Sequence, residues 1–123
     1  MDLQLQSKRA LVSGSTAGIG LAIATILARE GADVIVNGRS AARVEAAIKS
    51  VRAAGAKGDV QGLAADFSTV AGLDTVTRAF PKIDILVNNL GMYQPKPFEQ
   101  ISDEEWVEIF EVNVLSGIRL SRA

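Results

Sequence analysis

Three glycines, Gly14, Gly18 and Gly20, stand where a short apolar run passes into a helical pattern. Glycine lacks a Cβ atom, so the backbone can approach an anionic group closely, and the free N–H groups at a helix N-terminus carry a partial positive charge. Ser15 and Thr16 add two hydroxyl donors between the glycines. This spacing at a strand-to-helix turn predicts a site for a pyrophosphate. The alternative is a tight turn that uses glycine only for backbone freedom.

The end of the second apolar run, Asp33–Asn37, supplies the next candidates. At this place in a nucleotide-binding sheet, an acidic residue would hydrogen-bond the ribose hydroxyls of an adenosine and repel a 2′-phosphate. Here Gly38 is followed by Arg39 and Ser40. A planar guanidinium suits a phosphate monoester, and a serine at a helix N-terminus stands beside free N–H groups. The pattern favours a 2′-phosphorylated nucleotide; alternatively, Arg39 is a solvated residue before a helix.

A polar residue interrupts the apolar face near the end of the chain. Asn113 follows Trp106 by seven residues, Ile109 by four and Phe110 by three, so it shares their helical stripe. We expect this stripe to be buried, and a buried amide without partners costs about 1–3 kcal/mol. On spacing alone, an asparagine tied to neighbouring backbone is the favoured interpretation. Gly117, on the same face, would permit close approach of another segment.

Four apolar runs are expected to form the strands that position these residues. They are mostly continuous and not alternating, which is typical of parallel strands covered on both faces. Alternation of strands and helices predicts a doubly wound parallel α/β sheet with right-handed crossovers, of about four strands and four helices. The strands are expected at Lys8–Ser13, Asp33–Asn37, Val60–Ala65 and Ile83–Asn88.

Four helices are expected between and after the strands, each with an apolar stripe at 3.6-residue spacing. Gly31 and Gly55 are expected to end the first two and Pro81 the third, while Ser40 begins the second. Ser102 and Glu105 fit a capping box at the start of the fourth. The stripes are Ile19, Ile23, Ile26 and Leu27; Val44, Ala47, Ile48 and Val51; Val70, Leu73, Val76 and Phe80; and Trp106, Ile109 and Phe110.

Composition excludes several classes of function. Lysine plus arginine (13) and aspartate plus glutamate (14) nearly balance, so the basic excess of a nucleic-acid-binding protein is missing. No apolar run approaches the ~18 residues that span a bilayer, and a cytoplasmic location is the default expectation. The chain has no cysteine and no histidine. It therefore cannot supply a disulfide, a thiol nucleophile or a Ser-His-Asp triad, and we expect no metal site.

Four ordered motifs resemble one enzyme family over nearly all 123 residues. Residues 13–20, SGSTAGIG, resemble the TGxxxGIG signature of short-chain dehydrogenases/reductases, with serine in place of the usual threonine. Residues 88–91, NNLG, are similar to the NNAG element of that family, although Leu90 replaces alanine on the adenosine side. Asp66 matches the family aspartate that contacts the adenine ring, and Asn113 matches the helix asparagine of the catalytic tetrad.

The resemblance implies a Rossmann-type oxidoreductase that transfers hydride between NAD(P)(H) and a small carbonyl or alcohol substrate. It implies that Asn88 ties strands together and that the backbone at Asn113, the one catalytic residue expected here, holds a water of a proton relay. The ribose-binding acid of the family falls eighteen positions after Gly20, at Gly38, so NADP(H) is preferred and NAD(H) is possible. The expected cofactor-binding residues are Gly14, Ser15, Thr16, Gly18, Ile19, Gly20, Arg39, Ser40, Asp66, Asn89 and Gly91.

The Tyr-x-x-x-Lys pair that completes catalysis in this family has no match in the chain. Tyr93 is the one tyrosine, and the residue four positions further on is Pro97. Members of the family run to roughly twice this length. We therefore expect residues 1–123 to be the N-terminal part of a single NAD(P)-binding domain. Alone they would be inactive and prone to aggregate, because Ile83–Val87 would form an apolar sheet edge. The full-length protein is expected to form a homodimer or homotetramer, as relatives do.

Two other functions stay open on the sequence. A non-catalytic dinucleotide-binding or sensor module would keep the glycine turn and lack the chemistry. Another Rossmann enzyme, such as a methyltransferase or a relative of sugar-nucleotide epimerases, would share the turn as well. Methyltransferases use an acidic residue after the second strand for the ribose, so Gly38 and Arg39 argue against that class.

Overall fold

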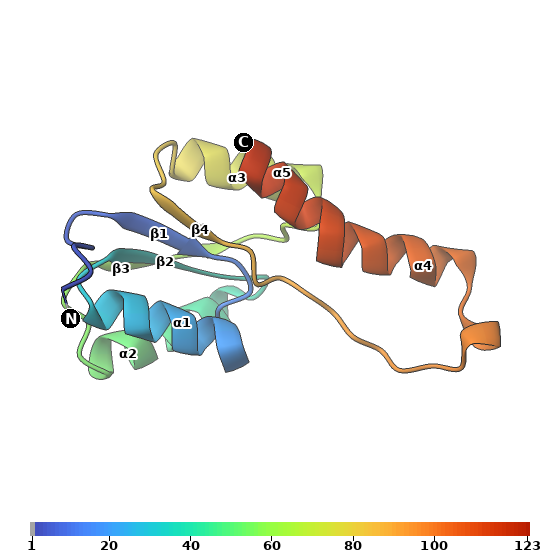
Figure 1. Ribbon diagram of the computed structural model, residues 1–123, viewed down its shortest axis with the longest axis horizontal. Helices are drawn as coiled ribbons and strands as arrows, with labels where there is room; N and C mark the ends of the chain where they lie inside the picture. The colour runs from blue at the N-terminus through green and yellow to red at the C-terminus, as the bar shows by residue number, and fades with distance from the viewer. Residues whose placement is uncertain (1) are drawn as a thin grey trace.

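Four parallel strands form one sheet in the order β3-β2-β1-β4 (Figure 1). The computed structural model describes residues 2–123. The chain runs outward from β1 to β3 and then returns to the other side of β1, so the direction of winding reverses between β1 and β4. Ligands of open α/β sheets bind at such a point, beyond the carboxyl ends of the strands. The strands are β1 Arg9–Val12, β2 Asp33–Gly38, β3 Val60–Ala64 and β4 Ile85–Val87.

Helices cover both faces of the sheet, which confirms the predicted doubly wound α/β fold. In Figure 1, α1 and α2 lie against one face, whereas α3 and α5 lie against the other. All four strands lie where the sequence predicts them, although β4 is shorter than expected. The helices are α1 Gly18–Arg29, α2 Ala41–Ala53, α3 Val70–Ala79, α4 Asp103–Phe110 and α5 Ser116–Arg122, with a 3₁₀ turn η1 at Phe98–Gln100 and a π-helical turn η2 at Glu111–Leu115.

Alternate residues of the two central strands enter two separate cores. Ala10 and Val12 of β1 pack with α1 and α2, whereas Leu11, between them, packs with Phe67, Val76 and Leu120 on the other face. Successive side chains of a strand point to opposite faces, so a strand covered on both faces must be apolar at every position. This explains why the strand runs are continuous and not alternating.

Local end signals of the helices are confirmed. Gly31 and Gly55 follow α1 and α2 with φ of +104° and +95°, a left-handed conformation that glycine adopts without strain. The Ser40 hydroxyl caps α2 by accepting a hydrogen bond from the Arg43 N–H at 3.4 Å. At α4, both hydrogen bonds of the Ser102 capping box are present. Within residues 2–123, no helix has the length and apolar character needed to cross a bilayer.

The buried face of α1 differs from the predicted one. Ile19 and Ile26 are 75% and 57% exposed, whereas Ala24 and Ala28 are fully buried. Small residues at four-residue spacing let the helix lie close to the sheet, and the larger side chains are left at its margins. The prediction that Ile19 and Ile26 face the core is therefore wrong.

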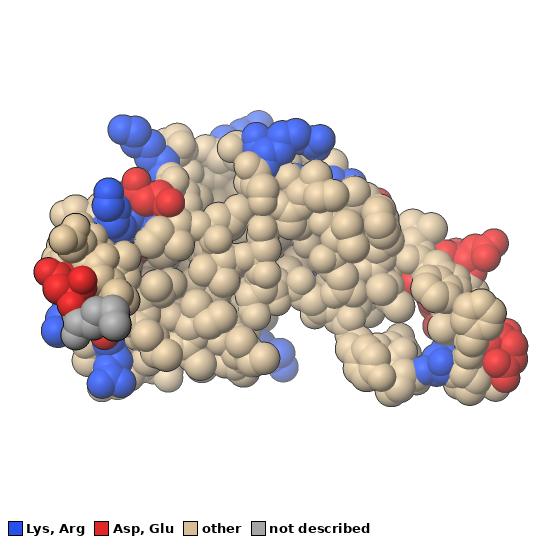
Figure 2. Space-filling model, in the orientation of Figure 1, with Lys and Arg blue, Asp and Glu red and all other residues tan. Residues whose placement is uncertain are grey.

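The prediction for α4 also needs correction. Trp106 and Phe110 are 48% and 51% exposed, and Asn113 is exposed as well. In Figure 1, α4 runs past the end of the sheet, so its apolar stripe has no core to enter. The capping box and acidic first turn that begin the helix lie at the end of the molecule where acidic side chains gather in Figure 2.

Glu105 gives the start of α4 a dependence on pH. Its carboxylate accepts hydrogen bonds from Lys96 Nζ and the Ser102 N–H, both at 2.7 Å. These hydrogen bonds lower the pKa of Glu105 from 4.5 to about 2, and the bond from Lys96 has the largest effect. A group with a lowered pKa stabilises the folded state above its unfolded-state value, and this stabilisation is lost as the pH falls through the folded-state value. The stabilisation that Lys96 and the cap add is therefore complete above pH 4.5 and is lost as the pH falls through about 2.

We expect the Ser102 amide resonance to titrate with a midpoint near the pKa of Glu105, about 2. NMR spectra between pH 6 and pH 1 would measure it. Glu105→Gln should abolish this titration, whereas Glu108→Gln on the same helix should leave it unchanged. A Ser102 resonance that does not respond to pH in the wild-type protein would contradict the prediction.

Candidate functional site

The three glycines lie at the junction of β1 and α1, as the sequence predicts. Gly14 and Gly18 have φ of +59° and +58°, so the backbone takes a left-handed conformation at both ends of the turn. Such a conformation strains any residue with a Cβ atom. The turn therefore needs glycine at these two positions, and it leads directly into the N-terminus of α1.

Gly20 is required for a different reason. Its conformation is helical, but a Cβ atom here would lie closer than van der Waals contact to the Gly14 carbonyl oxygen and to the Asn89 side-chain nitrogen. The first turn of α1 is thus pressed against the turn before it and against the loop after β4. This close packing holds the free N–H groups of the helix in place beside the carboxyl end of β1.

The hydroxyl of Ser15 is already in use within the protein. Ser15 is fully buried, and its Oγ donates to the Val12 carbonyl oxygen at 2.7 Å while it accepts the Asn37 N–H at 2.9 Å. Contrary to the prediction, this hydroxyl has no proton to offer a phosphate. It ties β1 to β2 instead. Thr16 is half-buried and lines a cavity, so its hydroxyl remains a candidate donor.

Asn37, the last residue of the predicted second strand, is a structural residue that the sequence interpretation missed. Its Oδ1 accepts the Gly14 N–H at 3.0 Å, and its Nδ2 donates to the carbonyl oxygens of Leu63 and Ala65, each at 3.1 Å. One buried side chain therefore joins the glycine turn, β2 and the end of β3. The signal in the sequence was a polar residue that ends an otherwise apolar buried strand.

Asn37→Ala should lower the free energy of unfolding by about 3 kcal/mol, because it leaves three main-chain groups without their partner. Urea denaturation followed by circular dichroism would measure the loss. The matched control is Asn88→Ala, which removes an exposed side chain with one hydrogen bond, from Nδ2 to Ser121 Oγ at 3.1 Å. We expect the control to cost less than about 1 kcal/mol. Equal losses for the two variants would contradict the role of Asn37.

A cavity of about 270 Å³ lies beside the turn. It brings together three segments that are far apart in the sequence: the glycine turn, the end of β2 with the start of α2, and the loop after β3. Five of the predicted binding residues line it, together with Leu90, at which the sequence departs from the family pattern. These five are Gly14, Thr16, Arg39, Ser40 and Asp66.

Among the described residues, the side of this cavity formed by the end of β2 and the start of α2 has two cations, Arg39 and Arg43, and no acid. Arg39 is exposed, and within residues 2–123 its guanidinium makes no ion pair. A Cβ atom on Gly38 would overlap the Thr16 methyl group, Cγ2. Thr16 thus fills the space in which a ribose-binding acid would begin, and the basic side chain one residue later is free to meet an anion.

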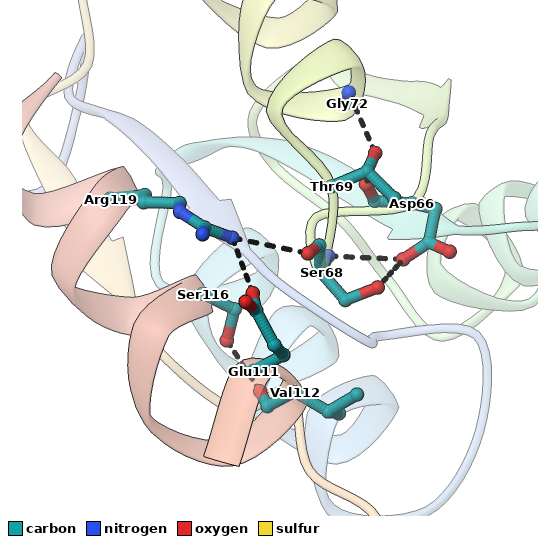
Figure 3. A network of polar contacts seen from close by, with 8 residues as sticks. All are labelled: Asp66, Ser68, Thr69, Gly72, Glu111, Val112, Ser116 and Arg119. Carbon is teal, nitrogen blue, oxygen red and sulfur yellow. Dashed lines mark hydrogen bonds and ion pairs between the residues drawn. The ribbon is translucent and has the colours of Figure 1, made fainter. Parts of the chain in front are cut away.

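Asp66 is held in a fixed orientation at the cavity. Its Oδ1 accepts the N–H and the hydroxyl of Ser68, at 3.0 and 2.6 Å (Figure 3). Asp66 is half-buried. Because Oδ1 is taken by Ser68, the second carboxylate oxygen is the one left to accept a hydrogen bond from a ligand.

Of the two asparagines after β4, the second and not the first ties the segments together. Asn89 Nδ2 donates to the carbonyl oxygens of Ser13 and Gly14, at 3.2 and 3.1 Å, and so ties the loop to the glycine turn. The side chain of Asn88 instead reaches Ser121 on α5. Successive side chains at a strand end point to opposite faces, which separates the two. The expectation that Asn88 ties the strands together is wrong; Asn89 does so.

Asn113 is bound to the backbone of another segment. Its Oδ1 accepts the Met92 N–H at 2.8 Å, and its Nδ2 donates to the Met92 carbonyl oxygen at 3.0 Å. A Cβ atom on Gly91 would lie 2.9 Å from Asn113 Oδ1, so the glycine makes room for this contact. Asn113 lies in the π-helical turn η2, a feature often found at functional sites. It holds the loop after β4 and does not line the cavity.

Comparison with known proteins identifies the family. The sequence pattern of the short chain dehydrogenase family matches residues 8–123, and the chain belongs to this family. It is 48% identical over 122 residues to an uncharacterized oxidoreductase, YvaG, of Bacillus subtilis (strain 168), covering 99% of this chain and 46% of that protein. It is 37% identical over 112 residues to gluconate 5-dehydrogenase of Gluconobacter oxydans (strain 621H), covering 89% of this chain and 44% of the relative.

A solved structure of the same fold contains a cofactor and a substrate. The chain resembles L-sorbose reductase from Gluconobacter frateurii, described in complex with NADPH and L-sorbose, with a TM-score of 0.90 and 35% identity. The likeness covers 99% of this chain and 48% of that one. The chain therefore spans about half the length of the relatives it matches.

Proposed function

We propose that this chain binds NADP(H) as the dinucleotide-binding part of a short-chain oxidoreductase. The observation that carries the proposal is the cavity, which joins the glycine turn to a basic side chain and to Asp66. A dinucleotide has three groups that fit these three walls: a pyrophosphate, a 2′-phosphate and an adenine. The complex of L-sorbose reductase with NADPH supports the same choice of cofactor.

Each wall of the site has a distinct task in this proposal. The N–H groups at the start of α1 bind the pyrophosphate, with Gly18, Ile19 and Gly20 as the backbone that approaches it. Arg39 and the Ser40 end of α2 bind the 2′-phosphate. Asp66 accepts a hydrogen bond from the adenine.

The loop after β4 supports the other half of the cofactor. Asn89 and Gly91 back the nucleotide, and Asn113 holds this loop through Met92. When bound, NADP(H) supplies the hydride, and the protein supplies orientation and electrostatics.

We propose that residues 1–123 form the cofactor-binding part of a single domain whose whole reduces a small carbonyl compound or oxidises the alcohol. The chain offers Asn113 but no Tyr-x-x-x-Lys pair. We therefore expect residues 1–123 alone to show no carbonyl reduction. Robust activity of material with a verified mass of 13.0 kDa would refute this. A cytoplasmic location stays a prediction.

A second copy of the protein is the proposed macromolecular partner. Trp106, Phe110, Val114 and Ile118 recur every four residues along α4, η2 and α5 and are 42–51% exposed. An exposed apolar stripe of this length is typical of a surface that another helix covers. A homo-oligomer that packs this stripe would explain why α4 has no core of its own.

Titration of the protein with NADPH and with NADH tests the choice of cofactor. We expect NADPH to bind about 100-fold more tightly, because the 2′-phosphate adds a charge-assisted contact worth about 3 kcal/mol. Isothermal titration calorimetry at fixed salt would measure both affinities. Equal or tighter binding of NADH would refute the preference.

A further inference from the structure

A guanidinium from α5 reaches the loop that carries Asp66. Arg119 Nη1 donates to the Ser68 carbonyl oxygen at 3.2 Å and to Glu111 Oε2 at 2.8 Å. The Arg119 side chain is only 19% exposed. Figure 3 shows the guanidinium between the π-helical turn and the loop, with both contacts drawn. The long helical segment at the end of the chain is thereby attached to a loop 51 residues earlier.

Fixing Ser68 also fixes the carboxylate of Asp66. The carbonyl oxygen of Ser68 accepts from Arg119, while the N–H and hydroxyl of Ser68 both donate to Asp66 Oδ1. Ser68 is therefore held on one side and orients Asp66 on the other. Arg119 therefore influences the orientation of Asp66 through Ser68.

The far side of the loop is held by α3. The Thr69 hydroxyl donates to the Asp66 carbonyl oxygen at 2.8 Å and accepts the Gly72 N–H at 3.1 Å. Phe67, between Asp66 and Ser68, is 2% exposed and packs in the core with Leu120, the neighbour of Arg119. The loop is thus held by α3 on one side and by α5 on the other. On the α5 side, Leu120 makes the apolar contact and Arg119 makes the hydrogen bond.

Glu111 gives the guanidinium its direction. A carbonyl oxygen is a neutral acceptor, and a long arginine side chain loses rotamer freedom when it is held against one. The ion pair with Glu111, which is 35% exposed, fixes the fork in the orientation that meets Ser68. Arg119 itself does not line the cavity, whereas Asp66 does.

We propose that Arg119 is a positioning residue for the adenine end of the cofactor site, acting through Ser68 on Asp66. This inference rests on the proposed function, because that proposal assigns Asp66 to the adenine. Arg119 does not touch the cofactor. It sets the orientation of the one carboxylate that recognises the adenine ring.

Affinities for two nucleotides test the proposal. Arg119→Gln should weaken the binding of NADPH about tenfold. This is the effect of losing one charge-assisted hydrogen bond of about 1.4 kcal/mol, the bond between Asp66 and the adenine. The variant should leave the affinity for reduced nicotinamide mononucleotide, which has no adenine, unchanged. Arg119→Lys keeps the charge and should recover most of the NADPH affinity. Arg122→Gln, on the same helix and exposed, is the matched control and should bind both nucleotides as the wild type does.

A double-mutant cycle separates positioning from a merely structural role. If Arg119 acts through Asp66, then Arg119→Gln should cause no further loss of NADPH affinity when Asp66→Asn is already present. Losses that add would overturn the proposal, and so would equal weakening of both nucleotides by Arg119→Gln alone. If Arg119→Gln does not fold, Glu111→Gln takes its place in the cycle with the same criterion, because it removes the ion pair that directs the guanidinium to Ser68.

Hydrogen exchange gives a readout that needs no cofactor. We expect the Ser68 amide to exchange at least about tenfold faster in Arg119→Gln than in Arg122→Gln, because the loop loses its attachment to α5. Unchanged exchange would overturn the proposal. A wild-type protein that binds neither nucleotide would refute the proposed function instead, and faster exchange would then still support the hold of Arg119 on the loop.

Discussion

Gly20→Ala is expected to weaken binding of NADP(H) at least about 100-fold. The new methyl group would overlap the Gly14 carbonyl oxygen and the Asn89 side-chain nitrogen. The carbonyl oxygen belongs to the backbone of the turn, so the turn itself must move. Two hydrogen bonds to a charged pyrophosphate, each worth about 1.5–3 kcal/mol, would be lost or lengthened. Calorimetric titration with NADPH would measure the effect.

The same variant should also be less stable than the wild type. Overpacking costs about 1–3 kcal/mol, whereas alanine in place of glycine favours a helix by up to about 1 kcal/mol. Any net loss of stability therefore comes from the contact and not from helix propensity. Gly55→Ala is the matched control: its φ of +95° makes alanine strained, but within residues 2–123 no atom beyond its two chain neighbours lies within 4 Å of the new Cβ. The control should lose stability and keep NADPH affinity; Gly20→Ala with wild-type affinity would contradict the account.

Arg39→Ala should weaken the binding of NADPH about 100-fold and leave the affinity for NADH unchanged. The guanidinium lines the cavity, and a hydrogen bond between two charged groups is worth up to about 3 kcal/mol. The difference in NADPH affinity between the wild type and Arg39→Ala should be smaller at high salt, because an exposed charge pair is screened. Arg78→Ala, on α3, removes the same net charge outside the cavity lining and should change neither affinity. Equal losses for NADPH and NADH would show that Arg39 does not read the 2′-phosphate.

Conversion to NADH preference should need more than an acid at position 38. Gly38→Asp combined with Arg39→Ala places a Cβ atom against the Thr16 methyl group. We expect this pair to bind NADH poorly until Thr16→Ser removes that methyl, after which NADH affinity should rise about tenfold. Tight NADH binding without the Thr16 change would contradict the steric role assigned to Thr16.

The sequence predicted those features whose cause is local. Gly14 and Gly18 need a left-handed backbone, and Gly31 and Gly55 end helices in the same conformation, so their residue type alone indicates their structure. The Ser102 capping box likewise depends on residues within one turn. Continuous apolar runs predicted buried parallel strands for the same reason.

The errors concern features that depend on distant neighbours. Ile19 and Ile26 belong to an apolar stripe, but Ala24 and Ala28 face the sheet because they allow close packing. The apolar stripe of α4 was predicted correctly as a pattern, yet that helix extends past the sheet. Periodicity indicates that a face is apolar and does not indicate what covers it.

The long-range hydrogen bonds of the site could not be predicted from the sequence. Asn37 and Asn89 hold the turn through partners 23 and 75 residues away in the chain, at Gly14. That Asn89 and not Asn88 holds the turn depends on which way each side chain points at a strand end. The contact of Arg119 with Ser68 has no sequence signal at all. Such contacts fix the orientation of side chains that motifs only locate.

All of the proposed cofactor binding depends on a pyrophosphate that binds the free N–H groups where β1 passes into α1. The most direct measurement is a two-dimensional ¹⁵N–¹H NMR titration of the labelled protein with NADP(H). We expect the largest shifts on the amides of residues 16–20, with a second group at residues 39–41. Saturable binding that leaves the amides of residues 16–20 unshifted would contradict this placement of the pyrophosphate.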